Sequence, residues 1–173
     1  MGGRPKGLLR TPDGGETLIE RLLRLSAEVG FEPMLVGAGE LGAVAQGLPR
    51  VFDREPHVGP LSGLAAMFDH AGERTCVAIA CDMPYVSAAL LSRLVRESPE
   101  ASVLAPRDHE TGKWHPLCAR YAPAQVAPVL TQALERGARS FQALFRELSV
   151  VELALSAAEQ SELRDWDTPE DMR

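Results

Sequence analysis

The sequence lacks the features of a membrane or secreted protein. No apolar run approaches the roughly 20 residues that a membrane-spanning helix needs, and the N-terminus does not have the pattern of a signal peptide. Cysteines are few and odd in number. Cys76 and Cys81 fall in one predicted strand, and the odd number of positions between them turns their side chains to opposite faces. We therefore expect no contact with a membrane, and a reduced protein in the cytoplasm.

Several common functional signatures are also absent. The chain has no G-x-G-x-x-G, no Walker A lysine motif, no G-x-S-x-G elbow and no zinc-ligand spacing. These absences argue against a dehydrogenase, a P-loop ATPase and a serine hydrolase. The net charge of −6, with acidic and basic residues interspersed, argues against a general nucleic-acid binder, although a local basic site for phosphates stays open.

The chain alternates between strand and helix patterns. Its 173 residues suit a single domain, which we assign to residues 1–173. Alternating strands and helices predict an α/β fold, with a mostly parallel sheet covered on both sides. Strands are predicted at 32–36, 50–53, 77–81, 102–106, 115–121 and 150–153, and helices at 17–29, 40–46, 64–71, 87–97, 126–134, 140–148 and from about 165 onwards.

The stretch from Val77 to Tyr85 joins a predicted strand to a carboxylate. The small and apolar residues 77–81 predict a strand buried on both faces at the centre of a parallel sheet. Pro84 prevents this strand from continuing past Asp82. Open α/β sheets bind their ligands at the carboxyl ends of such strands. Asp82 is therefore a candidate ligand for Mg²⁺. The alternative is that Asp82 only caps the helix that begins near Ser87.

Two glycine-containing segments are candidate sites for anionic groups. Gly2 and Gly3, close to Lys6, could wrap a phosphate with backbone N–H groups, although a frayed terminus would have the same composition. Residues 53–63 are predicted to form a loop before a helix. Such a loop can bind an anionic or polar group, or it can simply connect a strand to a helix.

Five segments in order along the chain carry recognisable motifs: residues 1–7, 53–63, 81–85, 115–117 and 165–170. Together they resemble the motifs of the MobA-like nucleotidyltransferases, and within that family the molybdenum cofactor guanylyltransferases. The segment 1–7 is similar to the end of the family's glycine-rich signature, and 53–63 to its D-x(n)-G-P-L-x-G segment. Residues 81–85 match C-D-x-P, residues 115–117 match H-P-L, and residues 165–170 resemble the terminal N-x-N-T-P-E motif.

The resemblance implies a Rossmann-like, three-layer α/β/α domain that transfers GMP from GTP to molybdopterin cofactor and releases pyrophosphate. Lys6, with Gly2 and Gly3, would lie against the nucleotide phosphates. Asp82 would hold the Mg²⁺ that bridges the phosphates, and Asp53 matches a position at the guanine nucleotide site. Such a reaction depends on holding the reacting phosphates in line and neutralising their charge.

The same resemblance implies where the acceptor would bind. Gly59, Pro60 and Gly63 would shape the wall near the nucleotide and the pterin. His115, Asp165 and Asp167 fall in segments that the family uses toward the molybdopterin side. The implied small-molecule partners are GTP and molybdopterin cofactor, with molybdoenzyme-maturation proteins as further candidates. The oligomeric state is left open.

The sequence departs from the family pattern at three places. It begins at a methionine inside the first signature, so we expect the family's first strand and glycine loop to be missing, through a start assigned too far downstream or through truncation. Residues 37–39 are Gly-Ala-Gly where many relatives have asparagines, and Asp165 and Asp167 replace asparagines of the terminal motif. Two alternatives therefore stay open. One is a related transferase that uses CTP or another phosphorylated acceptor, and the other is an inactive nucleotide- or pterin-binding protein.

Overall fold

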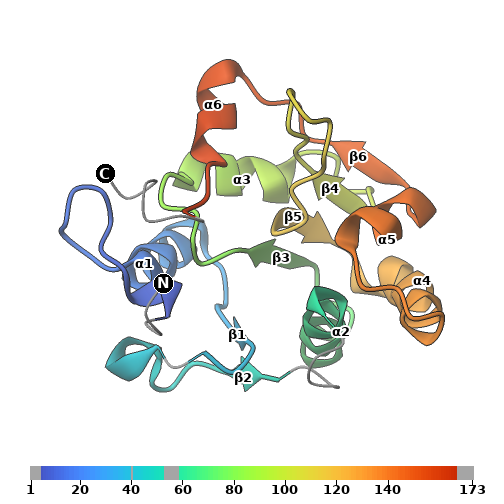
Figure 1. Ribbon diagram of the computed structural model, residues 1–173, viewed down its shortest axis with the longest axis horizontal. Coiled ribbons are helices and arrows are strands. Elements are labelled where there is room, and N and C mark those ends of the chain that lie inside the picture. The colour runs from blue at the N-terminus through green and yellow to red at the C-terminus, as the bar shows by residue number, and fades with distance from the viewer. Residues whose placement is uncertain (1–4, 40, 53–58, 167–173) are drawn as a thin grey trace.

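The computed structural model describes residues 5–39, 41–52 and 59–166, in which helices lie on both sides of a twisted set of strands (Figure 1). The larger sheet has the strand order β3 (Cys76–Ile79), β5 (Cys118–Tyr121), β4 (Val103–Ala105) and β6 (Val150–Glu152). Strand β4 is parallel to β6, and β5 is antiparallel to both β3 and β4. Strands β3, β4 and β6 therefore run in one direction, which confirms the α/β class and the mostly parallel sheet.

A smaller sheet pairs β1 (Leu35–Val36) with β2 (Arg50–Val51) in parallel. The 3₁₀ helix η2 (Gly42–Ala45) connects them, where the sequence pattern predicts a short α-helix. Helix α2 (Pro60–Ala71) contacts β1, β2 and β3 and so joins the two sheets.

The apolar side chains separate into two clusters on opposite faces of the larger sheet. Along β4, Val103 and Ala105 belong to one cluster and Leu104 to the other, as expected for a strand with apolar residues on both faces. Residues of α2, α4 (Pro123–Glu135) and α5 (Phe141–Glu147) fill the first cluster, and residues of α1 (Leu18–Val29) and α3 (Ala88–Arg96) fill the second. This arrangement confirms the predicted three layers.

Aromatic rings organise the first cluster. The Tyr121 ring, fully buried on β5, packs against Phe68 of α2 and Phe145 of α5, with ring centroids 5.8 and 6.1 Å apart. Such tilted and edge-on pairs add to the stabilisation from apolar burial. They fix α2 and α5 against the strand that follows the predicted H-P-L segment.

Two helix ends were predicted correctly, and one helix was missed. Gly30 ends α1 in the left-handed conformation, with φ 77°, and Ser87 caps α3. Helix α6 (Ala157–Glu162) has no counterpart in the prediction. Its signal was present in the sequence, because Ser156 and Glu159 form a capping box. No helix among residues 5–39, 41–52 and 59–166 is long and apolar enough to cross a membrane.

Two strand predictions were wrong in ways that affect the site. Within the described part of the chain, β3 lies at the edge of its sheet, paired with β5 alone, and its burial alternates instead of covering both faces. The strand predicted at 115–121 begins only at Cys118, because the Cys118 N–H donates to the His115 carbonyl and closes a turn around Pro116.

The loop predicted at 53–63 was also wrong at its C-terminal end. Helix α2 begins at Pro60, four residues before the predicted start, so that Ser62 and Gly63 are buried helical residues. Proline suits the first position of a helix because its φ is already helical and its missing N–H would have had no partner there.

Candidate functional site

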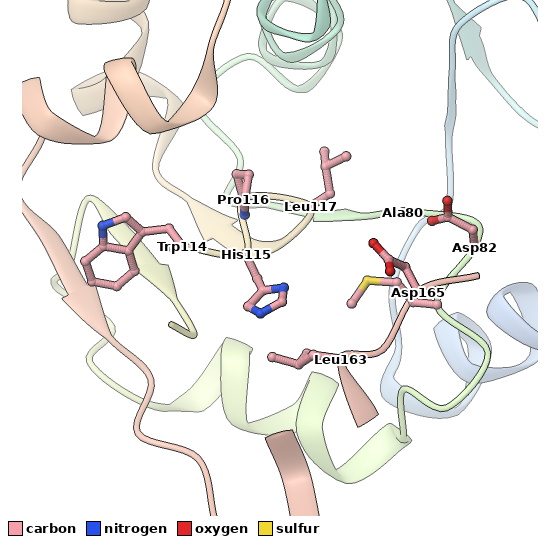
Figure 2. Close-up of a pocket in the computed structure, with 9 residues that line it drawn as sticks. Ala80, Asp82, Trp114, His115, Pro116, Leu117, Leu163 and Asp165 are labelled. Atoms are coloured by element: carbon pink, nitrogen blue, oxygen red, sulfur yellow. The ribbon is translucent and has the colours of Figure 1, made fainter. Parts of the chain in front are cut away.

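One pocket of about 370 Å³ brings together three of the predicted site residues. Asp82 comes from the turn after β3, His115 from the turn before β5, and Asp165 from the segment after α6 (Figure 2). Met83, Leu117 and Leu163 supply apolar parts of the wall. In the sequence, Asp82 and Asp165 are 83 positions apart and His115 lies between them. The fold places all three in one cavity.

Backbone hydrogen bonds fix the segments that form this pocket. The Ala80 N–H donates to the Leu117 carbonyl at 2.8 Å, and this bond ties the end of β3 to the turn that carries His115. The Trp166 N–H donates to the Asp82 carbonyl at 2.9 Å and so places Asp165 beside the Asp82 turn. In the view of Figure 2, the Asp165 carboxylate lies between the His115 ring and Asp82.

Asp82 forms an ion pair with Lys6. The ammonium Nζ of Lys6 lies 2.8 Å from Oδ2 of Asp82, and the Asp82 side chain is only 18% exposed. Lys6 lies in the 3₁₀ helix η1 (Lys6–Leu8). The structure therefore joins the predicted phosphate-binding lysine to the predicted metal ligand, which the separate sequence motifs could not establish.

The helix-cap alternative for Asp82 is wrong. The Ser87 hydroxyl accepts the cap bond from the Leu90 N–H at 3.2 Å, and the Ser87 N–H donates to Oε2 of Glu162 at 2.9 Å. The N-terminus of α3 is thus capped by Ser87, leaving Asp82 in the pocket with Lys6.

The His115 imidazole is a partly buried part of the pocket wall. Burial lowers the pKa of His115, although the charges of Asp108 and Asp165 act in the opposite direction. Its Nε2 is buried and has no hydrogen-bond partner among the described residues. A ligand in the pocket could therefore complete the hydrogen bonding of this ring.

Two residues that the sequence did not single out hold the His115 turn. Gln142 of α5 bonds to both backbone groups of Trp114: its Oε1 accepts from the Trp114 N–H at 3.2 Å, and its Nε2 donates to the Trp114 carbonyl at 2.8 Å. The Tyr121 hydroxyl donates to the Pro116 carbonyl at 2.7 Å. Spacing along the chain gave no signal for these contacts, because Gln142 lies 28 positions from Trp114.

The predicted glycine wall is not part of the lining of this pocket. Gly59, Pro60 and Gly63 do not line the pocket formed by Asp82, His115 and Asp165. Gly59 is the N-cap residue of α2, with φ 102°, and a Cβ at this position would lie 3.4 Å from the Arg139 carbonyl oxygen. Its positive φ favours glycine, whereas the contact with Arg139 is an ordinary one. The role of this segment near the nucleotide and the pterin stays a prediction.

Four predicted site residues lie outside the described part of the chain. They are Gly2, Gly3, Asp53 and Asp167. Their roles at the nucleotide and acceptor stay predictions.

The donor set around Asp82 fits a metal that shares its coordination with a substrate. No group of three or more His, Cys, Asp or Glu is placed to hold a metal ion within 5–39, 41–52 and 59–166. Mg²⁺ usually binds through one or two carboxylates together with phosphate oxygens and water. Asp82 and Asp165 supply two carboxylates in one pocket, which is as many as such a Mg²⁺ site takes from the protein.

Comparisons with known proteins identify the family. Residues 1–152 match the family model described as the MobA-like NTP transferase domain. A probable molybdenum cofactor guanylyltransferase of Opitutus terrae is 33% identical over 98% of this chain and 85% of its own length. A molybdenum cofactor guanylyltransferase of Xanthomonas euvesicatoria is 31% identical, over 97% of this chain and 84% of its own.

Solved structures show the same fold. The molybdopterin-guanine dinucleotide biosynthesis protein A of Archaeoglobus fulgidus superposes with a TM-score of 0.77 and 26% identity, over 98% of this chain and 88% of its own. The 2-C-methyl-D-erythritol 4-phosphate cytidylyltransferase of Thermus thermophilus superposes with a TM-score of 0.68 and 20% identity, over 97% of this chain and 90% of its own. At that identity the second likeness concerns the fold alone.

Proposed function

The chain belongs to the MobA-like NTP transferase family, and we propose that it transfers GMP from GTP to molybdopterin cofactor, forming the guanine dinucleotide cofactor and pyrophosphate. One observation carries this proposal: Asp82, His115 and Asp165 share one pocket, and Lys6 is ion-paired to Asp82 at its edge. A reduced cytoplasmic protein fits this role, and the three cysteines are free thiols.

Lys6 and Asp82 would act on the nucleotide. The Lys6 ammonium is a compact charge that can bind a triphosphate oxygen, and it is held toward the pocket by Asp82. Asp82, with Asp165 beside it, would hold Mg²⁺, which when bound neutralises the charge of the phosphates. Transfer between phosphates needs little covalent chemistry from the protein. These residues would therefore contribute by positioning the phosphates and by neutralising their charge.

His115 and Asp165 would act on the acceptor. The imidazole offers a buried ring nitrogen to a polar group of the pterin, and Leu117 and Leu163 supply an apolar surface for its ring system. The acceptor phosphate would then approach the α-phosphate of GTP near Asp82, and the leaving pyrophosphate would depart on the side of Lys6.

A second candidate is a related nucleotidyltransferase that takes CTP or a different phosphorylated acceptor. What favours it is that Asp165 stands where the family's terminal motif has an asparagine and lies in the same pocket as Asp82, so the contacts to the acceptor would differ from the family pattern. The two candidates differ in the nucleotide consumed and in the acceptor.

One experiment separates these candidates. Pyrophosphate release is measured with GTP, CTP or ATP, each with Mg²⁺ and with or without molybdopterin cofactor. The proposal requires release with GTP and molybdopterin, and a fall of about 100-fold or more in Asp82→Asn. Glu152→Gln, which changes an exposed carboxylate on β6, should leave the rate unchanged. Release with CTP alone favours the second candidate, whereas nucleotide binding without release with any nucleotide would indicate a binding protein.

A further inference from the structure

A second pocket, of about 320 Å³, lies next to the transfer site but is lined by different residues. The turn after β3 contributes to both pockets. Asp82 and Met83 line the first pocket, and Pro84 and Tyr85, which follow directly in the chain, line the second. None of the residues that line the second pocket has a role in the proposed transfer.

Arg21 of α1 supplies an unsatisfied donor in this second pocket. Its Nη1 is buried and has no hydrogen-bond partner among the described residues. A guanidinium stays charged at every physiological pH and cannot relieve its burial by losing a proton. A buried donor of this kind is costly unless an acceptor is present. The group that would complete the site is therefore an acceptor, preferably an anion.

The other charged groups of this pocket already have partners. Arg24 donates to the Glu16 carboxylate at 2.7 and 3.3 Å. Asp13 accepts from the Thr11 hydroxyl and from the Gly15 N–H. The pKa of Asp13 is lowered chiefly by the bond from Thr11, with a smaller contribution from the nearby Arg21 charge. Among the described residues, neither carboxylate accepts a hydrogen bond from Arg21, which lines the same pocket.

The wall on the other side is apolar and held in place. Pro84 is buried, and the Tyr85 ring is packed edge-on against Trp166 with the ring centroids 6.4 Å apart. The Arg164 guanidinium lies over the Tyr85 ring, 5.1 Å from its centroid. A fixed proline and a fixed aromatic ring beside the unsatisfied Arg21 Nη1 suit a ligand with an anionic group on a flat or aliphatic body.

We infer that this pocket is a second binding site, for a small molecule whose phosphate or carboxylate group pairs with Arg21 and whose flat or aliphatic body packs on Pro84 and Tyr85. Carboxylate and phosphate groups can both pair with a guanidinium through two parallel hydrogen bonds. The volume lies at the lower end of the range for small-molecule sites, so the ligand is small. The inference rests on the unpaired Arg21 donor and on the pocket, and it does not depend on the transferred nucleotide.

The test uses phenyl phosphate and benzoate as probes, with benzamide as the uncharged control, in titrations of the isotope-labelled full chain followed by NMR. We expect saturable shifts at Arg21 and Tyr85 with at least one charged probe and none with benzamide. A response to phenyl phosphate alone identifies a phosphate ligand, and a response to benzoate alone identifies a carboxylate. Absence of saturable shifts with both charged probes would overturn the inference.

Three variants assign the site. Arg21→Gln should weaken binding about tenfold or more, as expected for the loss of a charge-assisted hydrogen bond. Arg24→Gln should change it less than about threefold, because Arg24 is already paired with Glu16. Asp82→Asn should bind the probe as the wild type does, which separates this site from the transfer pocket. Equal binding by Arg21→Gln and the wild type would refute the assignment.

The stability of the free protein gives an independent check. If the Arg21 Nη1 lacks a hydrogen-bond partner, Arg21→Gln should melt at the same temperature as the wild type or higher, because the variant removes this buried, unsatisfied donor. A melting temperature of Arg21→Gln more than about 4 °C below that of the wild type would mean that Arg21 has a structural partner. For a chain of this size, that shift corresponds to a loss on the order of 1 kcal/mol in the free energy of unfolding. That result would also overturn the inference.

Discussion

The Lys6 ammonium lies 2.8 Å from Oδ2 of Asp82, although the two residues are 76 positions apart in the chain. The two side chains are 32% and 18% exposed, so the pair is partly shielded from water. The pair holds Lys6 at the edge of the pocket that contains His115 and Asp165. A triphosphate arriving there would meet a positive charge that is already oriented.

Lys6→Ala should therefore weaken GTP binding. A charge-assisted hydrogen bond contributes about 1.5–3 kcal/mol, which corresponds to a rise in the Kd for GTP of roughly 10- to 100-fold. The measurement is a GTP titration in the presence of Mg²⁺. Lys113→Ala is the matched control, because Lys113 is exposed on a turn. Equal GTP affinities in Lys6→Ala and in the wild type would remove Lys6 from the nucleotide site.

Sequence patterns correctly predicted the structural features that depend on a few neighbouring residues. The Gly30 helix end and the Ser87 cap were correct because each depends on a few adjacent residues. The pairing of strands was not predictable in this way: the edge position of β3 depends on β5, about 40 residues further along the chain. The contacts of Gln142 with Trp114 join two elements that share no motif, and only the packing of α5 against β5 brings them together.

The Gln142 side chain should prove to be a positioning residue for the His115 turn. Gln142→Leu removes both hydrogen bonds to Trp114 and leaves a partly buried N–H and carbonyl unpaired. We expect a loss of about 1–3 kcal/mol in the free energy of unfolding. If the turn also shifts, the KM for the acceptor should rise more than the KM for GTP, a difference that simple destabilisation would not produce.

Gln132→Leu is the control for this variant, since it makes the same chemical change at an exposed position of α4. Its free energy of unfolding should change by no more than about 0.5 kcal/mol. The two variants are compared by urea unfolding and by steady-state kinetics with each substrate varied in turn. Equal stabilities of the two variants would contradict the proposed role of Gln142.

His115 should make stability depend on pH below neutrality. Burial lowers the pKa of His115 in the folded chain from its ordinary value of 6.5, so the unfolded chain binds the proton more readily. The stabilising contribution is present above pH 6.5 and is lost as the pH falls through the lower folded pKa. Between pH 7.5 and 5.5 the wild type should lose stability relative to His115→Gln.

The measurement is urea unfolding of the wild type and His115→Gln at a series of pH values. Taking the difference between the two proteins cancels the titration of groups that they share. A wild type that gains stability relative to the variant as the pH falls would mean that a carboxylate, either Asp108 or Asp165, dominates the environment of His115.

Trp166 should anchor the segment that carries Asp165 to the pocket. The indole is 5% exposed and packs edge-on against Tyr85, three positions after the buried Leu163. Trp166→Ala removes this anchor and should cost about 3–5 kcal/mol of unfolding free energy if the cavity does not collapse. Because Asp165 would then lose its position beside Asp82, the rate of transfer should fall as well, in assays run below the melting temperature of the variant.

Trp166→Phe distinguishes packing from hydrogen bonding. The indole Nε1 has no hydrogen-bond partner among the described residues, so phenylalanine loses no bond there and keeps an aromatic ring against Tyr85. We expect Trp166→Phe to recover most of the stability and activity that Trp166→Ala loses, and Val151→Ala, at an exposed position of β6, to change stability by no more than about 0.5 kcal/mol. Equal losses of stability and activity in Trp166→Phe and Trp166→Ala would contradict this explanation. They would mean that the indole N–H binds a partner, and that packing against Tyr85 does not hold Asp165 beside Asp82.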